Sequence, residues 1–338
     1  MSDQIDSLTK RGIAAATLNS SIGIKDTRLI KEGLAQKRYK LLYVAPETLL
    51  NEDLIVFLLQ TNTISCIAID EAHVISTYGS SFRPKYKKLS ELKDYFPDVP
   101  IIALTATLNK EGIEDVIKTL KLDTPNTFIH SIDRPSIQYN IFMKRDGSKQ
   151  IISIIDKYKD QAGIIYCSTV GQVDEIATYL QYRGYNCKPY HSKLKKKEKE
   201  ATLEEYLNGT LSIMVATIAF GMGIDKSDIR FVIHNNLPSS VDAYLQETGR
   251  ASRDGLSSSA YLLYDDADKG LYSFLWSKTI KNPEALKMQH MHLRKLDNIL
   301  LNNSNCRRKM LLREFGEEID DCNNCDVCLD HQTLKDAL

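Results

Sequence analysis

The chain lacks the features that would tie it to a membrane, to secretion or to a strongly charged partner. Its 338 residues contain no run of 18 apolar residues and no signal-peptide pattern. Its 44 basic residues balance 44 acidic ones, so the net charge is +0. A chain without excess positive charge can contact nucleic acid only through local patches. These absences predict an intracellular, soluble protein with no membrane partner.

A further absence concerns phosphate binding. No Gly-Lys-Ser or Gly-Lys-Thr occurs anywhere in the sequence. In a glycine-rich loop of that kind, backbone amides and the lysine hold the phosphates of a bound nucleotide. The sequence therefore carries no such phosphate-cradling loop.

The sequence contains a set of short apolar runs that predict parallel strands. They lie at 41–45, 66–69, 101–104, 163–167, 213–216 and 231–234. Each run is continuous rather than alternating, which is typical of strands buried on both faces of a sheet. Helical segments such as 169–183 and 195–208 lie between them, so the expected class is α/β. The segment Asp133-Arg-Pro-Ser136 is expected to link two such sheets, because proline disfavours helix in the residue before it.

Two adjacent carboxylates, Asp70 and Glu71, follow the run at 66–69. At the tip of a strand, the aspartate can hold a magnesium through its water shell and the glutamate can orient an attacking water. A helix N-cap is the alternative for the aspartate. His73 taken alone is most often a residue that satisfies a hydrogen bond. The next run ends in Thr105-Ala-Thr107, whose hydroxyls either pass a signal from a nucleotide or form a simple turn.

The stretch Phe220-Gly-Met-Gly-Ile-Asp225 follows another apolar run. Its glycines, among them Gly223, let the backbone approach a ligand closely, and exposed amides suit a phosphate. Asp225 is a candidate for holding a ribose hydroxyl. A bulge or an ordinary turn is the alternative.

Gln246, Arg250 and Arg253 lie at spacings of four and three, which predicts one face of a helix start. Planar guanidinium groups stabilise charge on a transferring phosphoryl group. A surface arginine pair is the alternative, although Gly249 beside Arg250 favours close approach to a ligand. The lysine-rich run at 193–199 is interpreted as a solvated helix start rather than a phosphate contact.

Four cysteines near the C-terminus have the spacing C-x15-C-x2-C-x2-C. They are Cys306, Cys322, Cys325 and Cys328. Close pairs of thiolates favour one tetrahedral structural zinc, and disulfides are disfavoured in a reducing compartment. Because all four positions are thiols, no open coordination site for catalysis is expected. Cys66 and Cys167 lie in strand-like runs and are interpreted as plain buried residues.

The order of these motifs is more specific than any one of them. It resembles that of superfamily-two helicases, and more narrowly the RecQ family of DNA helicases, from about residue 2 to residue 330. The motifs in family order are Ala45-Pro-Glu47, Asp70-Glu-Ala-His73, Ala103-Leu-Thr-Ala-Thr107, Gly163-Ile-Ile-Tyr-Cys167, Val215 to Asp225 and Gln246 to Gly255.

The resemblance implies ATP-dependent 3′–5′ unwinding of DNA in repair and recombination. It implies ATP and Mg²⁺ as cofactors, structural Zn²⁺, and single-stranded or partially duplex DNA as the partner. In that family Asp70 and Glu71 would serve magnesium and water, and Arg250 and Arg253 would act as arginine fingers. The compartment would be the cytoplasm, in association with the nucleoid, or the nucleus.

The resemblance also implies two RecA-like parallel-sheet domains and a small helical zinc-binding subdomain. The expected boundaries are 1–132, 133–265 and 266–338. The family's adenine motif and Gly-Lys-Ser/Thr loop would lie upstream of residue 1, so the first domain is expected to lack an interior strand. The family's winged-helix domain would lie beyond the other end. We therefore expect residues 135–330 to fold better alone than residues 1–134.

The stretch from Thr77 to Pro84 resembles the aromatic-rich loop that senses single-stranded DNA in RecQ proteins. Tyr78 and Phe82 would stack on bases and Arg83 would pair with phosphate, whereas an ordinary loop with packed aromatics is the alternative. The sequence departs from the family here, with Tyr78 for the usual tryptophan. It also has Ser80 and Ser81 for the usual histidine and aspartate, and Ser252 for a glycine of the last motif.

Two functions follow from these observations. One is a RecQ-like ATP-dependent DNA helicase, represented by a truncated or split reading frame. The other is a non-catalytic remnant that binds DNA or a protein partner. An RNA-directed helicase is a weaker third alternative, disfavoured by the cysteine cluster and by the Phe-Arg-Pro loop.

The sequence by itself predicts that the 338-residue chain, purified alone, hydrolyses ATP at a negligible rate. Without the phosphate loop the nucleotide is not positioned, and positioning supplies most of phosphoryl-transfer catalysis. The measurement is ATP turnover with and without single-stranded DNA. DNA-stimulated turnover that is abolished by Glu71→Gln would contradict this prediction.

Overall fold

The computed structural model describes residues 5, 8–19, 22–61, 64–76, 84–218, 220–221 and 225–329. The chain divides into two compact units, Met1–Ile129 and His130–Leu338. None of the helices in these described ranges is long and apolar enough to cross a membrane. Four candidate ligand residues, Tyr78, Phe82, Arg83 and Gly223, lie outside the described residues.

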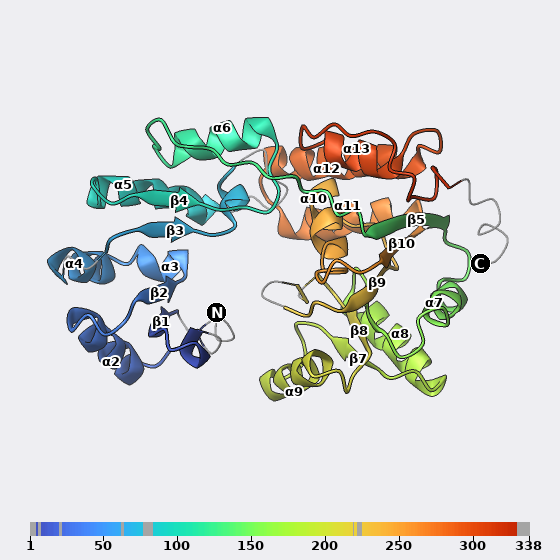
Figure 1. Ribbon diagram of the computed structural model, residues 1–338, viewed down its shortest axis with the longest axis horizontal. Helices are drawn as coiled ribbons and strands as arrows, with labels where there is room; N and C mark the ends of the chain where they lie inside the picture. The colour runs from blue at the N-terminus through green and yellow to red at the C-terminus, as the bar shows by residue number, and fades with distance from the viewer. Residues whose placement is uncertain are drawn as a thin grey trace. The chain divides into compact units, whose positions relative to one another are not determined.

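The second unit is built on a six-stranded parallel sheet with the order β5-β10-β9-β6-β8-β7 (Figure 1). The strands are β5 (Ile137–Met143), β6 (Ala162–Tyr166), β7 (Cys187–Tyr190), β8 (Ile213–Ala216), β9 (Ile229–His234) and β10 (Ser258–Tyr264). Every residue of β6, β8 and β10 is buried, as the continuous runs at 163–167 and 213–216 predict. The crowding at the sheet centre requires Gly163, where a Cβ would lie 2.0 Å from the Phe231 ring.

Helices cover both faces of this sheet. They are α7 (Gly147–Ile155), α8 (Val170–Tyr182), α9 (Lys196–Leu207) and α10 (Val241–Thr248). Three of them begin at a side-chain cap, in which Asp146, Thr169 or Ser240 accepts a backbone N–H three residues on. Successive residues of a strand enter different cores: Ile164 packs on one face and Ile165 on the other. The sheet is therefore buried on both faces, as predicted.

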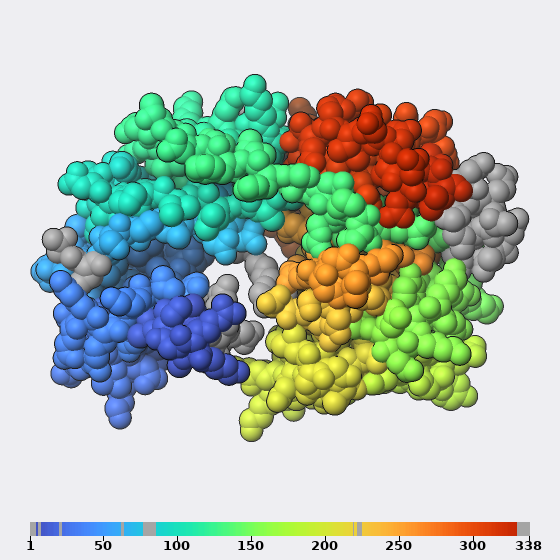
Figure 2. Space-filling view, viewed as in Figure 1, coloured from blue at the N-terminus to red at the C-terminus, as the bar shows by residue number. Residues whose placement is uncertain are grey.

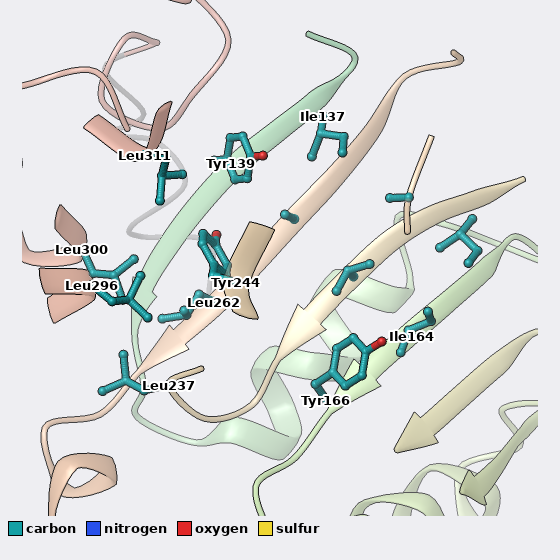
Figure 3. Packing of buried hydrophobic residues seen from close by; sticks show 14 of the residues in the cluster. Ile137, Tyr139, Ile164, Tyr166, Leu237, Tyr244, Leu262, Leu296, Leu300 and Leu311 are labelled. Carbon is teal, nitrogen blue, oxygen red and sulfur yellow. The ribbon is translucent and has the colours of Figure 1, made fainter. Parts of the chain in front are cut away.

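Three further helices extend the core that contains Ile164. They are α11 (Ala267–Thr279), α12 (Pro283–Leu301) and α13 (Arg307–Arg313). Figure 3 shows Leu296, Leu300 and Leu311 directed at Tyr139 of β5 and Tyr244 of α10. The helices after residue 266 are therefore part of the second unit's core rather than a separate appendage.

The cysteine-rich loop that follows α13 covers the outer edge of β5. The backbone N–H of Asp326 donates to Tyr139 O at 2.9 Å, and its carboxylate accepts the N–H of Ile141 at 3.2 Å. Cys325 forms a parallel bridge with Tyr139. In Figure 2 the red C-terminal segment accordingly lies against the green segment that contains β5. An edge that would otherwise present unpaired backbone groups is closed by the chain itself.

The first unit contains two separate two-stranded parallel sheets among its described residues. β1 (Ala15–Leu18) pairs with β2 (Leu41–Val44), and β3 (Ile67–Ile69) pairs with β4 (Ile101–Ala103). The surrounding helices are α2 (Ile24–Ala35), α3 (Pro46–Leu49), α4 (Glu52–Thr61), η1 (Ala72–Ile75), η2 (Pro84–Glu91), α5 (Leu92–Tyr95) and α6 (Lys110–Thr119).

The prediction of strands buried on both faces is wrong for this first unit. Ile67, Ile69 and Ala103 face its core, whereas Ile102 on the opposite face is 48% exposed. The prediction that Cys66 is buried is wrong for the same reason, because it lies on the outer face next to β3 and is exposed. Among the described residues of the first unit, the core cluster lies on one side of β3 and β4. Cys167 in the second unit is buried, as predicted.

Residues 1–129 and residues 130–329, prepared as separate fragments, are expected to behave differently. The second should be soluble and unfold cooperatively, because its six strands form one sheet that is buried on both faces. The first should aggregate, because its strands pair only in twos and Leu41, Ile102 and Leu104 are 44–50% exposed. Thermal melts and light scattering measure both properties. A sharp, aggregation-free transition for 1–129 would contradict this expectation.

Candidate functional site

In the first unit, the candidate carboxylates lie directly after β3. Asp70 is exposed, and its Oδ1 accepts the backbone N–H of Glu71 at 2.9 Å. Glu71 has φ 53° and ψ 41°, a left-handed conformation that is uncommon for residues other than glycine. Such a conformation costs about 1–3 kcal/mol, so the surrounding structure has to maintain it. Glu71, not Asp70, occupies the cap position of η1, and it makes no side-chain capping bond there.

His73 connects this turn to the end of β4. Its ring is buried, and Nδ1 lies 3.2 Å from Glu71 Oε2 and 3.1 Å from Thr105 Oγ1. The Thr105 hydroxyl donates to Thr107 O at 3.1 Å. The backbone reinforces the same junction, since Ala72 N–H donates to Leu104 O at 2.8 Å. The structure thus brings together the carboxylates, the histidine and the two threonines, which the sequence places in separate motifs.

In the second unit, the two arginines lie beyond the end of α10 and not on a helical face. The helix ends at Thr248, so Gln246 is in its last turn while Arg250 and Arg253 follow in a loop. The expectation of one helix face is therefore wrong. Within this loop Ser252 adopts φ 59°, a left-handed conformation.

Both arginines are hydrogen-bonded within the second unit. The Arg250 guanidinium donates to Gly221 O, and a Cβ on Gly221 would lie 2.7 Å from Arg250 Nη2. Arg253 Nη1 lies 3.2 Å from Asp225 Oδ1, and the Asp225 side chain is 93% exposed. Two sequence candidates, Asp225 and Arg253, are thus paired with each other. Glycine at 221 allows the close approach of Arg250 to the backbone.

A buried pair next to these arginines has no counterpart in the sequence interpretation. His234 at the end of β9 is 1% exposed, and its Nε2 lies 2.6 Å from Glu247 Oε2 on α10. The Tyr166 ring stacks on the imidazole at 5.3 Å, and its hydroxyl donates to Phe220 O at 3.0 Å. Burial raises the pKa of Tyr166 well above its usual range, so the hydroxyl remains a donor. The position of His234 at a strand end was the only signal available in the sequence.

The lysine-rich run at 193–199 forms the start of α9, which begins at Lys196. The Lys196 side chain is 90% exposed, and its ammonium lies 3.8 Å from Glu200. The favoured interpretation as a solvated helix start agrees with this geometry.

The four C-terminal cysteines form one cluster. Their sulfur atoms all lie within 4.8 Å of one another, and Cys322 Sγ is 3.9 Å from Cys328 Sγ. All four are free thiols rather than two bonded pairs. Four sulfurs at about 2.3 Å from a central zinc would lie about 3.8 Å apart, so the cluster fits a tetrahedral ion. The Cys322 thiol, hydrogen-bonded to Cys325, lowers the pKa of Cys325 to about 4.

The buried side chain of Arg307 holds the loop that carries these sulfurs. Arg307 is 2% exposed and pairs with Asp326 at 3.0 Å. Its Nη1 also donates to Ile299 O and Leu300 O at 2.9 and 2.8 Å, which satisfies carbonyls at the end of α12. The same guanidinium therefore caps a helix and fixes the residue next to Cys325.

Sequence comparisons match the chain in three parts. Residues 1–116 match the DEAD/DEAH box helicase family, residues 146–255 the helicase conserved C-terminal domain, and residues 266–329 the RecQ zinc-binding domain.

Two relatives extend these matches over the whole chain. The ATP-dependent DNA helicase RecQ of Pasteurella multocida is 40% identical over 341 residues, covering 100% of this chain and 53% of the relative. The protein of the same name from Bacillus subtilis is 36% identical over 341 residues and is covered to 57%. The chain therefore spans about half the length of these curated relatives.

Among solved structures, the DUF1998 helicase MrfA bound to DNA and AMPPNP matches 95% of this chain and 48% of its own chain. The TM-score is 0.65 at 16% identity, which shows a shared fold. The parallel sheets, the four-cysteine cluster and the similarity of this whole chain to part of two RecQ proteins lead to one conclusion. The chain belongs to the RecQ family of helicases, with a RecA-like helicase fold and a RecQ zinc-binding domain.

Proposed function

We propose that this chain carries the motor chemistry of a RecQ-like helicase that couples ATP hydrolysis to 3′–5′ DNA unwinding in repair and recombination. The observation that carries the proposal is the junction at the end of β3. There an exposed Asp70 stands beside Glu71, whose backbone is left-handed and whose carboxylate lies 3.2 Å from His73 Nδ1. Hydrolysis of a nucleotide needs a magnesium ligand and a group that orients water, and this junction supplies both.

Each carboxylate has a distinct task in this proposal. Asp70, exposed and without a basic partner among the residues that the structure describes, would hold a magnesium ion, which neutralises charge on the phosphates when bound. Glu71 would orient the attacking water and accept its proton. His73 keeps the Glu71 carboxylate in position and joins it to Thr105, so a change at one motif reaches the other.

Arg250 and Arg253 would stabilise the charge of the phosphoryl group. In the structure their donors are directed at Gly221 O and at the Asp225 carboxylate. Binding a phosphate therefore requires each guanidinium to exchange an oxygen of the second unit for a phosphate oxygen. For Arg250 this exchange is favourable, because a charged phosphate is a stronger acceptor than the Gly221 carbonyl.

The cysteine cluster is proposed to hold a structural zinc. Its four sulfurs leave no position for water, so the ion would stabilise the loop and not react. DNA is the proposed substrate because both RecQ relatives are DNA helicases by name. The stretch with Tyr78, Phe82 and Arg83 is proposed as the DNA-sensing loop on sequence alone.

A second candidate function is a non-catalytic member of the family that binds DNA or a partner. The 338 residues contain no Gly-Lys-Ser or Gly-Lys-Thr, so this stretch by itself supplies no phosphate-cradling loop. The two candidates differ in one property. A catalytic chain regains ATP hydrolysis when a phosphate loop is supplied, whereas a non-catalytic descendant does not.

A chimera in which a RecQ-family segment carrying the Gly-Lys-Ser/Thr loop precedes residue 1 is expected to hydrolyse ATP and unwind a 3′-tailed duplex. Glu71→Gln in the chimera should lower ATP turnover at least about 100-fold, because it removes the proton acceptor. Glu111→Gln, an exposed carboxylate on α6, is the matched control and should leave turnover unchanged. A folded, DNA-binding chimera without hydrolysis would instead support the non-catalytic function.

Metal analysis of freshly reduced protein is expected to find one zinc per chain. Cys325→Ser should release the metal and make residues from about 280 onward sensitive to protease, because bound zinc contributes folding energy. It should also lower the melting temperature of the second unit, since the loop covers the edge of β5. Cys66→Ser, at an exposed cysteine, is the control and should retain zinc. Reduced protein without zinc would rule the site out.

A further inference from the structure

The first residues of the second unit form a connection that the sequence does not reveal. Residues 131–136, here named the anchor segment, contain the stretch that the sequence suggests is a linker. In the structure they are bonded on one side to the cysteine module (residues 306–328) and on the other to the arginine loop (residues 249–253). Both sets of contacts span more than 110 positions of sequence.

On the module side, three side chains hold the anchor segment. Glu317 accepts the Ser131 hydroxyl at 2.5 Å and the Ile132 N–H at 3.0 Å. The buried Arg308 guanidinium donates to Pro135 O at 3.2 Å, and its Nε lies 3.4 Å from Asp133. Asn324, between two of the cysteines, donates to Pro135 O at 3.1 Å. The anchor segment is thus attached to the module at several successive residues.

On the other side, Arg134 holds the arginine loop by its backbone. Nη1 donates to Gly249 O at 3.0 Å, and Nη2 donates to Ala251 O at 3.0 Å and to Ser252 O at 2.7 Å. These carbonyls flank Arg250 on both sides and immediately precede Arg253. A planar guanidinium with several donors in a fixed fork can satisfy three carbonyls at once, which a lysine ammonium cannot do in the same plane.

The loop needs this support because α10 ends just before it. Carbonyl groups at a helix C-terminus have no partner within the helix, and Arg134 supplies one from outside. Ser252 adds a second requirement, because its backbone is left-handed where the family usually has glycine. Its buried hydroxyl lies 2.5 Å from Ser136 Oγ and 2.6 Å from Leu256 O. The anchor segment therefore contacts both the carbonyls and the strained residue.

We propose that Arg134 is a positioning residue for Arg250 and Arg253, and that the cysteine module determines the geometry of these arginines through the anchor segment. The functional meaning rests on the proposed phosphate role of the two arginines. The positioning of the arginine loop by Arg134 does not depend on that phosphate role. It gives the cysteine module a part in nucleotide chemistry without any contact between the module and a nucleotide.

The experiment is hydrogen–deuterium exchange on the full chain, combined with NMR of the arginine Nε–H groups. Arg134→Ala is expected to accelerate amide exchange across residues 249–256 about tenfold or more, because it removes bonds from a charged donor. The Nε resonances of Arg250 and Arg253 should shift or broaden. Arg134→Lys should show a smaller effect in the same peptides. Arg145→Ala, at an exposed arginine of the same unit, is the control and should change neither measurement.

The contribution of the module is tested with Arg308→Lys. This residue contacts Pro135 O and Ile137 O but makes no hydrogen bond to the arginine loop. Faster exchange at 249–256 in this variant, with exchange in β6, β8 and β9 unchanged, would support the proposal. Unchanged exchange at 249–256 in the Arg134 variants would overturn it. An equal acceleration throughout the sheet would also overturn it, because that result indicates general destabilisation. If Arg134→Ala does not fold, Arg134→Lys decides between these outcomes.

The phosphate role is tested separately, by ATP hydrolysis of the phosphate-loop chimera carrying Arg250→Lys. Undiminished hydrolysis there would overturn the proposed role of Arg250 and leave the loop result intact. The two failures are therefore distinguishable.

Discussion

The second unit depends on the closure of one sheet edge. A parallel sheet buried on both faces has to satisfy the backbone groups of its outer strands, and β5 is such a strand. The cysteine loop satisfies it, because Asp326 bonds to Tyr139 and Ile141 through its backbone and its carboxylate. The Arg307 guanidinium holds the same carboxylate and the end of α12. The sheet, the C-terminal helices and the sulfur cluster therefore form one structural system, in which a metal at the cluster would stabilise the edge of the sheet.

The two units differ in how completely their strands are covered. In the second unit, adjacent residues such as Ile164 and Ile165 enter two separate cores. Among the described residues of the first unit, a core cluster meets only one side of β3 and β4, and Ile102 on the other side is about half exposed. The candidate carboxylates of the first unit nevertheless lie in a well-bonded junction. Glu71 keeps an unfavourable backbone conformation there because His73 and the backbone bond between Ala72 and Leu104 hold the turn.

The arginine loop shows how two candidate phosphate-binding side chains are held by residues from elsewhere in the chain. Arg250 and Arg253 follow a helix end, where backbone carbonyls lack partners, so their placement depends on donors from elsewhere in the chain. Arg134 supplies those donors, and Ser136 contacts the hydroxyl of Ser252. The serine that replaces the family's usual glycine is thus accommodated by a hydroxyl partner. A substitution that looks unfavourable in the loop alone is compatible with the structure once the anchor segment is included.

The sequence by itself determined the α/β class, the strands at 163–167, 213–216 and 231–234, the helices near 169–183 and 195–208, and the four cysteines. These features depend on local periodicity and close spacing, which a linear pattern records. It missed β5 and β10, where polar residues such as Asn140 and Ser258 interrupt the apolar run, although the fold buries them. It also misplaced Cys66 and assigned the arginines to a helix. Only the tertiary structure decided which face of a strand is covered, that His234 meets Glu247, and that Arg134 reaches Gly249 from 115 positions away. Such contacts join residues far apart in the chain, and no local pattern of side chains specifies them.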